Sequence, residues 1–138
     1  SIARERGIEV RESRVSEIED YTSLISLTVK TSKTARHVSG TLFGRKDPRI
    51  VSIESMRVEV VPDGSMLILT NNDKPGVIGS IGTFMGENSI NIARMQLGRE
   101  KAGGRAVAVV SIDSPVANDL LDRLAKLPNI LSVKQVRL

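Results

Sequence analysis

Apolar residues in the second half of the chain follow two different periods. Residues 75–87 and 115–127 carry them at spacings of three and four, which predicts two amphipathic helices. Short β-rich runs lie around these helices, and the predicted strands are 66–70, 91–99, 105–112 and 130–136. The order strand, helix, strand, strand, helix, strand predicts a ferredoxin-like βαββαβ domain with both helices on one face of an antiparallel sheet.

The first half reads almost entirely as strands after a helical turn that ends at Gly7. The predicted strands are 8–13, 24–31, 36–43, 49–53 and 56–61. The turn-forming residues 61–64 (Val-Pro-Asp-Gly) predict a domain boundary. We therefore expect an α+β protein in which a smaller, mostly-β domain, 1–62, precedes the ferredoxin-like domain, 63–138. The smaller domain is expected to be truncated or completed by upstream residues, because the chain begins without Met and inside a helix.

Composition and charge narrow the classes of function. The net charge is +4 and the pI near 9.8, but basic and acidic residues are mixed along both halves and aromatic residues make up only 2%. Nucleic-acid binding, which uses clustered basic residues and stacking aromatics, is therefore not expected. No apolar run is long enough to span a membrane, and no cysteine is present. We expect a cytoplasmic protein with no membrane partner, no metal site and no catalytic residues within this chain.

The most informative segment is 69–78, LTNNDKPGVI, where the first strand of the second domain meets its first helix. Asp73 is predicted to be the N-cap of that helix, and Pro75 suits its first turn. Free amides at the start of a helix, together with the helix dipole, form a site for an anion such as an α-carboxylate. The predicted amide donors are Gly76, Val77 and Ile78, and the predicted acceptors for an ammonium group are Asn71, Asp73 and Asn91.

Simpler interpretations of the same residues stay open at this point. An Asx-rich turn that caps a helix usually binds no ligand. The glycines of the first helix recur near one face, and close packing against another element is the interpretation we favour for them. The residues of this stripe are Gly76, Gly79, Gly82 and Gly86.

These segments resemble a known family. The runs 73–79 (DKPGVIG) and 89–93 (SINIA) are similar to the ACT domain that closes D-3-phosphoglycerate dehydrogenases. Segments of the first half resemble the intervening, or allosteric substrate-binding, domain of the longer bacterial form, and they are 7–12, 20–27, 38–53 and 58–64. The resemblance covers essentially the whole chain. Ser89 stands where the family commonly has glycine, so Ser89 or its neighbour Asn88 is expected to adopt a left-handed conformation.

The resemblance implies a regulatory fragment of an enzyme that oxidises 3-phosphoglycerate with NAD, the first committed step to L-serine. NAD and the catalytic groups would belong to upstream domains, so no cofactor is expected in this fragment. It further implies that ACT domains pair into a homo-oligomer (a dimer of the fragment, a tetramer of the parent) and bind L-serine as effector at their interface. Asn71 and Asp73 would contact serine from one protomer, Asn91 from the other, and the amides after Pro75 its carboxylate. Arg49 matches a position that holds an anion in some relatives.

Two alternatives are carried forward. The chain also suits the regulatory part of an iron–sulfur L-serine dehydratase, whose small chain pairs similar domains. The second alternative is an ACT pair that only holds an oligomer together. The sequence upstream of this chain discriminates between the two enzymes, because only the dehydrogenase has a nucleotide-binding domain there.

Overall fold

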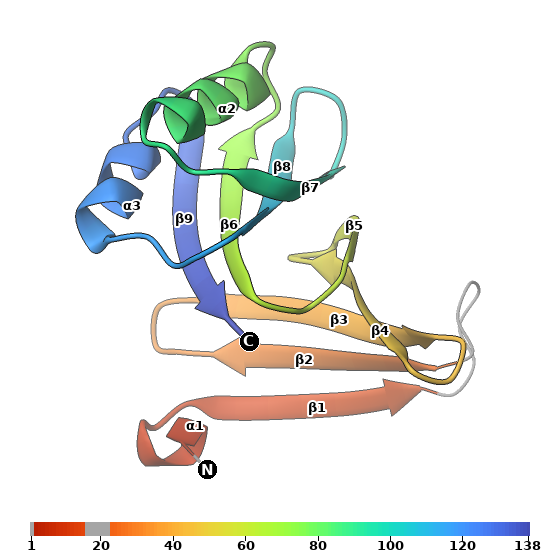
Figure 1. Ribbon diagram of the computed structural model, residues 1–138. Coiled ribbons are helices and arrows are strands. Elements are labelled where there is room, and N and C mark those ends of the chain that lie inside the picture. Colours follow the sequence, from red (N-terminus) through yellow and green to blue (C-terminus); the bar gives the residue numbers. More distant parts are fainter. Residues whose placement is uncertain (1, 16–22) are drawn as a thin grey trace. The chain divides into compact units, whose positions relative to one another are not determined.

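A computed structural model describes residues 2–15 and 23–138. The chain divides between Val61 and Pro62 into two compact units, and each unit has its own antiparallel sheet (Figure 1). Two antiparallel sheets with a few helices confirm the predicted α+β class. In the part of the chain that is described, no helix is long and apolar enough to cross a lipid bilayer.

The N-terminal unit is a meander of five strands that follows the short helix α1 (Ile2–Glu5). The strands, in sheet order, are β1 (Glu9–Val15), β2 (Leu24–Lys30), β3 (Ala35–Phe43), β4 (Asp47–Ile53) and β5 (Met56–Val60). All five predicted strands are therefore present. Strand β4 begins two residues earlier than predicted, because the fixed φ of Pro48 is compatible with extended backbone near the start of a strand. In β5, buried Met56, Val58 and Val60 alternate with exposed residues, as the period-2 pattern predicts.

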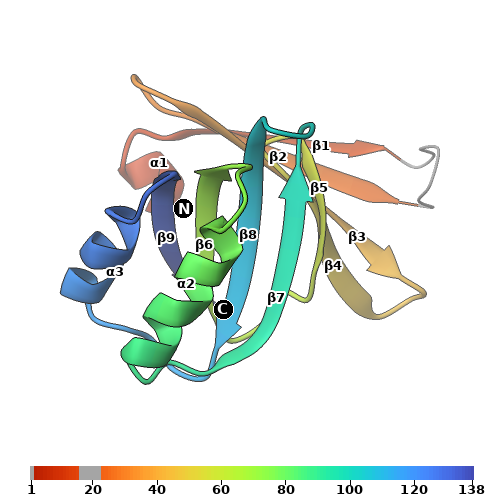
Figure 2. The ribbon, with the colours of Figure 1, turned by 90° about the horizontal axis from the view of Figure 1, so that it is seen from above.

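The C-terminal unit has the predicted βαββαβ order. Its elements are β6 (Ser65–Asn72), α2 (Val77–Glu87), β7 (Ile92–Arg99), β8 (Arg105–Ile112), α3 (Asn118–Ala125) and β9 (Ile130–Arg137). The sheet order is β7-β8-β6-β9 with every pair antiparallel, and this confirms the ferredoxin-like fold. Both helices cover the same face of this sheet (Figures 1 and 2). Strands β7 and β9 form its two edges.

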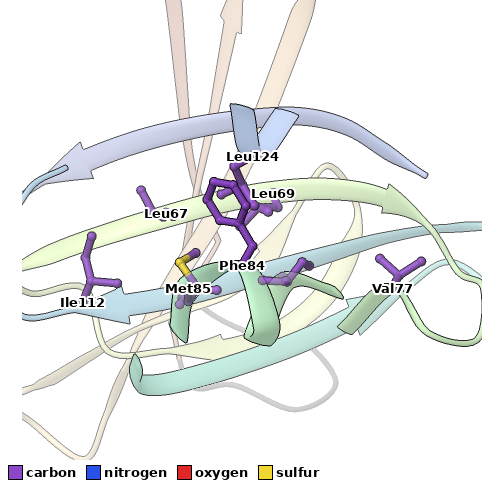
Figure 3. Packing of buried hydrophobic residues seen from close by; sticks show 10 residues of the cluster. Leu67, Leu69, Val77, Phe84, Met85, Ile112 and Leu124 are labelled. Carbon is purple, nitrogen blue, oxygen red and sulfur yellow. The ribbon is translucent and has the colours of Figure 1, made fainter. Parts of the chain in front are cut away.

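The core of the C-terminal unit lies between the two helices and the inward face of β6 and β8 (Figure 3). Alternate residues of β6, such as Leu67 and Leu69, are fully buried against it. Helix α2 contributes Ile81, Phe84 and Met85. Helix α3 contributes Leu124, and the Arg123 guanidinium lies 5.5 Å from the centroid of the Phe84 ring. The two predicted apolar stripes therefore face one common core.

Both helices begin later than predicted. Helix α2 begins at Val77 rather than Pro75, because Gly76 adopts a left-handed conformation (φ 88°) and breaks the helical path. Helix α3 begins at Asn118 rather than Pro115. There the side chain of Gln135 on β9 holds the backbone of Val116, accepting from its N–H (2.7 Å) and donating to its carbonyl (3.1 Å). These bonds hold the residues after Pro115 in an extended conformation, so the helix begins only at Asn118.

Backbone details after and within α2 settle two further expectations. Ser89 has φ 57° while Asn88 keeps φ −101°, so the left-handed position falls on Ser89, at a cost of about 1–2 kcal/mol. The expected close packing of the helix glycines is wrong within the described residues. A methyl group on Gly79, Gly82 or Gly86 would meet no atom of another element within 4 Å, so this face of α2 has room for larger side chains.

The core makes a direct prediction for stability. Leu69→Ala removes a side chain with 0% exposure from the centre of the cluster, and we expect it to lower the free energy of unfolding by about 2–5 kcal/mol. Amide hydrogen exchange of β8, which pairs with β6, reports the stability of this unit separately. Leu131→Ala, on β9 and 52% exposed, is the matched control and should change exchange little. Equal effects of the two variants would contradict this description of the core.

Candidate functional site

A pocket of about 290 Å³ lies where β6 ends and α2 begins, against the last residues of β7 and the first of β8. Its volume suits a small molecule. Polar and charged side chains from one loop and two strands surround an apolar floor. The residues that line it are Asn71, Asp73, Lys74, Val77, Ile78, Leu97, Gly98, Arg99, Ala106 and Val107.

Asn71 is the buried polar residue of this pocket. Strand β6 continues to Asn72, beyond its predicted end, so Asn71 lies in the sheet on the same side as Leu67 and Leu69 and is 3% exposed. Its Nδ2 donates to the carbonyl of Asn72 (2.8 Å). Its Oδ1 is buried and has no hydrogen-bond partner among the described residues. A buried acceptor without a partner costs about 1–3 kcal/mol, so a group that bonds to it would recover that free energy.

Asp73 is not the N-cap of α2, and this prediction was wrong. Its Oδ2 accepts from Nη1 of Arg99 (2.9 Å) and from the amide of Gly103 (3.1 Å), both in or beside the β7–β8 turn. Its own amide donates to the carbonyl of Gly104 (2.8 Å). Oδ2 of the carboxylate is therefore occupied by the turn across the pocket, four residues before the helix begins. The Arg99 hydrogen bond, followed by that of Gly103, lowers the pKa of Asp73 below its ordinary value of 3.8.

The start of α2 presents amide donors, displaced by one residue from the prediction. Gly76 occupies the N-cap, and no side chain caps the helix. The amide of Val77, one of the predicted donors, already lies 3.4 Å from the carbonyl of Lys74. The amides of Ile78 and Gly79 come next, in the first turn, where α-helical backbone offers no acceptor. Ile78 lines the pocket, so this end of the dipole faces it.

Asn91, the third predicted acceptor, lies far from Asn71 within one chain. It precedes β7, and its Nδ2 donates to Oδ2 of Asp113 (3.3 Å). The pocket lies at the opposite end of β7, where Arg99 pairs with Ala106 and Ala106 with Asn71. Eight residues of strand correspond to roughly 26 Å. The structure therefore brings Asn71 and Asp73 together and leaves Asn91 outside the pocket of its own chain.

Arg49 belongs to the N-terminal unit. It lies on β4, with its guanidinium 5.3 Å from the centroid of the Phe43 ring and Nη1 donating to the carbonyl of Pro48 (2.9 Å). Both contacts hold the side chain along the β3–β4 hairpin. Among the described residues, no group of three or more metal-ligating side chains is present in either unit.

Sequence reasoning missed the wall of the pocket that β7 and β8 supply. Arg99 and Ala106 are the main omissions, together with Lys74 on the loop. A signal for Arg99 was present, because the alternation of Met95 and Leu97 continues to Arg99 on the same face of the strand. Ala106 could not be found in this way, since its importance depends on which strand pairs with β6.

Two family models match the chain in the order of its two units. Residues 1–54 match the D-3-phosphoglycerate dehydrogenase intervening domain, and residues 65–129 match the ACT domain. The chain joins a D-3-phosphoglycerate dehydrogenase intervening domain to an ACT domain. The pocket at Asn71 and Asp73 belongs to the ACT domain.

Curated relatives match this chain along nearly its whole length. D-3-phosphoglycerate dehydrogenase from Archaeoglobus fulgidus is 39% identical over an alignment of 139 positions, and the alignment covers 99% of this chain and 26% of the relative. The Bacillus subtilis enzyme of the same name is 34% identical, with the same two shares. A probable L-serine dehydratase β chain from Bacillus subtilis is 25% identical over 98% of this chain and 61% of its own length. The chain thus spans about a quarter of the dehydrogenases that it matches.

The Asp73–Arg99 pair of the ACT domain can be tested by titration. We expect NMR titration of the Asp73 carboxyl to give a pKa below 3.8, and Arg99→Met to raise it toward that value. Because the folded pKa is the lower one, the stability from this pair is present above the unfolded pKa and is lost as pH falls through the folded pKa. An unchanged pKa in Arg99→Met would contradict the assigned partner.

Proposed function

We propose that this chain is the regulatory end of an NAD-dependent D-3-phosphoglycerate dehydrogenase and that L-serine binds in the ACT-domain pocket. The relatives of that name, at 39% and 34% identity over 99% of the chain, support the parent enzyme. In this proposal, NAD and the oxidation of 3-phosphoglycerate belong to the three quarters of the parent outside these residues. The chain's own role is to bind the effector and to pass its binding free energy to the rest of the oligomer.

The observation that carries the proposal is the buried, unpartnered Oδ1 of Asn71 beside the start of α2. A free amino acid carries an acidic and a basic group on one carbon atom. The amides of Ile78 and Gly79 supply donors for the α-carboxylate, and the helix dipole favours its charge. Oδ1 of Asn71 supplies an acceptor for the ammonium. Asp73 supplies a second one and the countercharge, since its two bonds to the β7–β8 turn both end on Oδ2 and leave Oδ1 for the ligand.

A second copy of the ACT domain completes the site in this proposal. Strand β7 is an edge of the sheet, so its outer backbone groups are available to pair with another strand. Antiparallel pairing of β7 with β7 of a second copy places Asn91 of that copy at the Arg99 end of the first strand. Asn91 lies roughly 26 Å along β7 from the pocket of its own chain. In the paired arrangement it comes close to the pocket of the other chain, and neither chain has to change its conformation.

The likeness to a probable L-serine dehydratase β chain favours one alternative parent, a dehydratase in which the same pocket would meet serine in another context. The dehydratase is the second candidate, because the identity of this chain to the dehydrogenases is higher. The coding sequence upstream discriminates between them, because a nucleotide-binding domain there supports the dehydrogenase. A third interpretation, in which the ACT pair only holds the oligomer together, predicts no heat with serine.

Calorimetric titration of L-serine into the 138-residue chain tests the site. We expect saturable, stereospecific binding at one site per ACT domain, with D-serine as the control. Asn71→Leu replaces the acceptor by an apolar group of similar size, and we expect serine affinity to fall at least tenfold. The free energy of unfolding should stay the same or rise, because the variant removes a buried acceptor that lacks a partner.

Unchanged serine affinity in Asn71→Leu would remove Asn71 from the site. No heat from the wild-type chain at millimolar L-serine would count against the effector proposal and favour the scaffold interpretation. Amide exchange of β8 in the same samples shows whether the variant is folded.

The shared site makes a separate prediction for mixed oligomers. Asn71→Leu and Asn91→Ala should each bind serine weakly alone. In a dimer that contains one chain of each kind, one site carries both substitutions and the other carries neither. Random mixing should therefore restore about a quarter of the wild-type binding capacity, because each isologous dimer has two such sites.

No recovery of binding after mixing would show that Asn91 does not act across the interface. Mass spectrometry of the intact, mixed oligomers provides the control, since it shows that chains have exchanged.

A further inference from the structure

One row of side chains crosses the ACT sheet at the mouth of the pocket. Arg99 on β7 pairs with Ala106 on β8, and Ala106 pairs with Asn71 on β6. All three line the pocket, so they share the helix-covered face of the sheet. Neighbouring strands lie about 4.8 Å apart, which places Arg99 and Asn71 roughly 10 Å apart with only the methyl group of Ala106 between them. The small side chain of Ala106 therefore leaves the floor of the pocket open.

Arg99, at one end of this row, has hydrogen-bond donors beyond the one that bonds to Asp73. A guanidinium carries five N–H groups, and the bond to Asp73 involves Nη1. Its side chain is 58% exposed, so it can reorient within the mouth of the pocket. Leu97 and Ile78 supply the apolar parts of the same rim. Among the described residues that line the pocket, the other positively charged one is Lys74, on the loop before α2.

The proposed placement of an amino acid leaves the side chain on its α-carbon unassigned. The carboxylate meets the start of α2, and the ammonium meets Asn71 and Asp73. Of the lining that remains, the open floor at Ala106 and the guanidinium of Arg99 lie in one row with Asn71. In this placement the side chain of the ligand lies there.

We propose that Ala106 and Arg99 determine which amino acid the site accepts. Ala106 provides the room for a short side chain, and Arg99 donates a hydrogen bond to an oxygen atom on it. The ligand class is therefore an amino acid with a short, oxygen-bearing side chain, in preference to an aliphatic one of the same size. This inference rests on the proposed function and adds the residues that give it selectivity.

A purely structural role of Arg99, which is to hold Asp73, has a different signature. Losing that support would weaken the ammonium contact, and so would weaken every amino acid by the same factor. A contact between Arg99 and the ligand's side chain changes the ratio of affinities instead. L-Serine and L-alanine differ only by the hydroxyl group, so the ratio of their dissociation constants reports the contacts of that hydroxyl, and the change of this ratio in an Arg99 variant reports the part that Arg99 supplies.

Calorimetry with these two ligands tests Arg99. In the wild-type chain we expect L-serine to bind about tenfold or more tightly than L-alanine, and Arg99→Met to bring the ratio near one. Arg137→Met removes the same charge from β9, the opposite edge of the sheet and outside the pocket, and should keep the wild-type ratio. A wild-type ratio that survives in Arg99→Met overturns the inference and leaves the proposed function intact. A wild-type chain that binds no amino acid overturns both.

Ala106 is tested with ligands that differ in side-chain size. Ala106→Val fills the floor, and we expect it to weaken L-serine about tenfold or more while glycine, which has no side chain, keeps its affinity. Ala106→Gly adds no bulk and should improve L-threonine relative to L-serine, so the test does not depend on one variant folding. Ala117→Val, exposed before α3 and outside the pocket, is the matched control. Wild-type ratios in both Ala106 variants would overturn the role of this residue.

Discussion

The packing of two helices on one face of a four-stranded sheet is the constraint from which the rest of the C-terminal unit follows. Leu69, Ile81 and Leu124 have no exposed surface, and each comes from a different element of that sandwich. Burial of apolar surface on this scale is the dominant favourable term in folding. This burial places the odd-numbered residues of β6 on the face of the sheet that the helices cover. Asn71 is therefore buried by the register that buries Leu67 and Leu69, and the pocket begins where that row of leucines ends.

The fold could be predicted from the sequence because its signals are local and periodic. The helical stripes of α2 and α3, the alternation in β5 and the turn at Gly103 each depend on neighbours within a few residues. The starts of the helices were less predictable. Asp73 has the right chemistry for an N-cap, but a partner 26 positions away in the sequence, Arg99, competes successfully for its carboxylate. Gln135 acts in the same way on the backbone before α3. Hydrogen bonds from side chains to residues far away in the sequence produce no periodic pattern, so the sequence alone does not predict them.

The residues of the candidate site also fall into those that local sequence signals predict and those that long-range contacts bring in. Residues 71–78 are contiguous, so their polar groups could be recognised together from the amino-acid sequence alone. Ala106 and Gly103 enter the site only through strand pairing and the conformation of a turn. Arg99 stands between these cases, since the alternation along β7 indicates its face but not its partner. The contacts of Asp73 with the β7–β8 turn show why this matters: they join the two loops that border the pocket, so a ligand that bonds to Asp73 also acts on the turn opposite.

The length of β7 carries a thermodynamic consequence for the proposed regulator. In the proposed site, Asn71 and Asn91 come from different chains, so a complete site would exist only in the associated state. Effector binding and self-association would then be linked equilibria: each occupied site would stabilise the pairing of two β7 edges, and each pairing would raise the affinity for the effector. The response to serine would depend on the concentration of the protein as well as on that of the ligand. In this proposal the edge strand β7, which is unpaired on its outer side in one chain, would couple the concentration of a metabolite to quaternary structure.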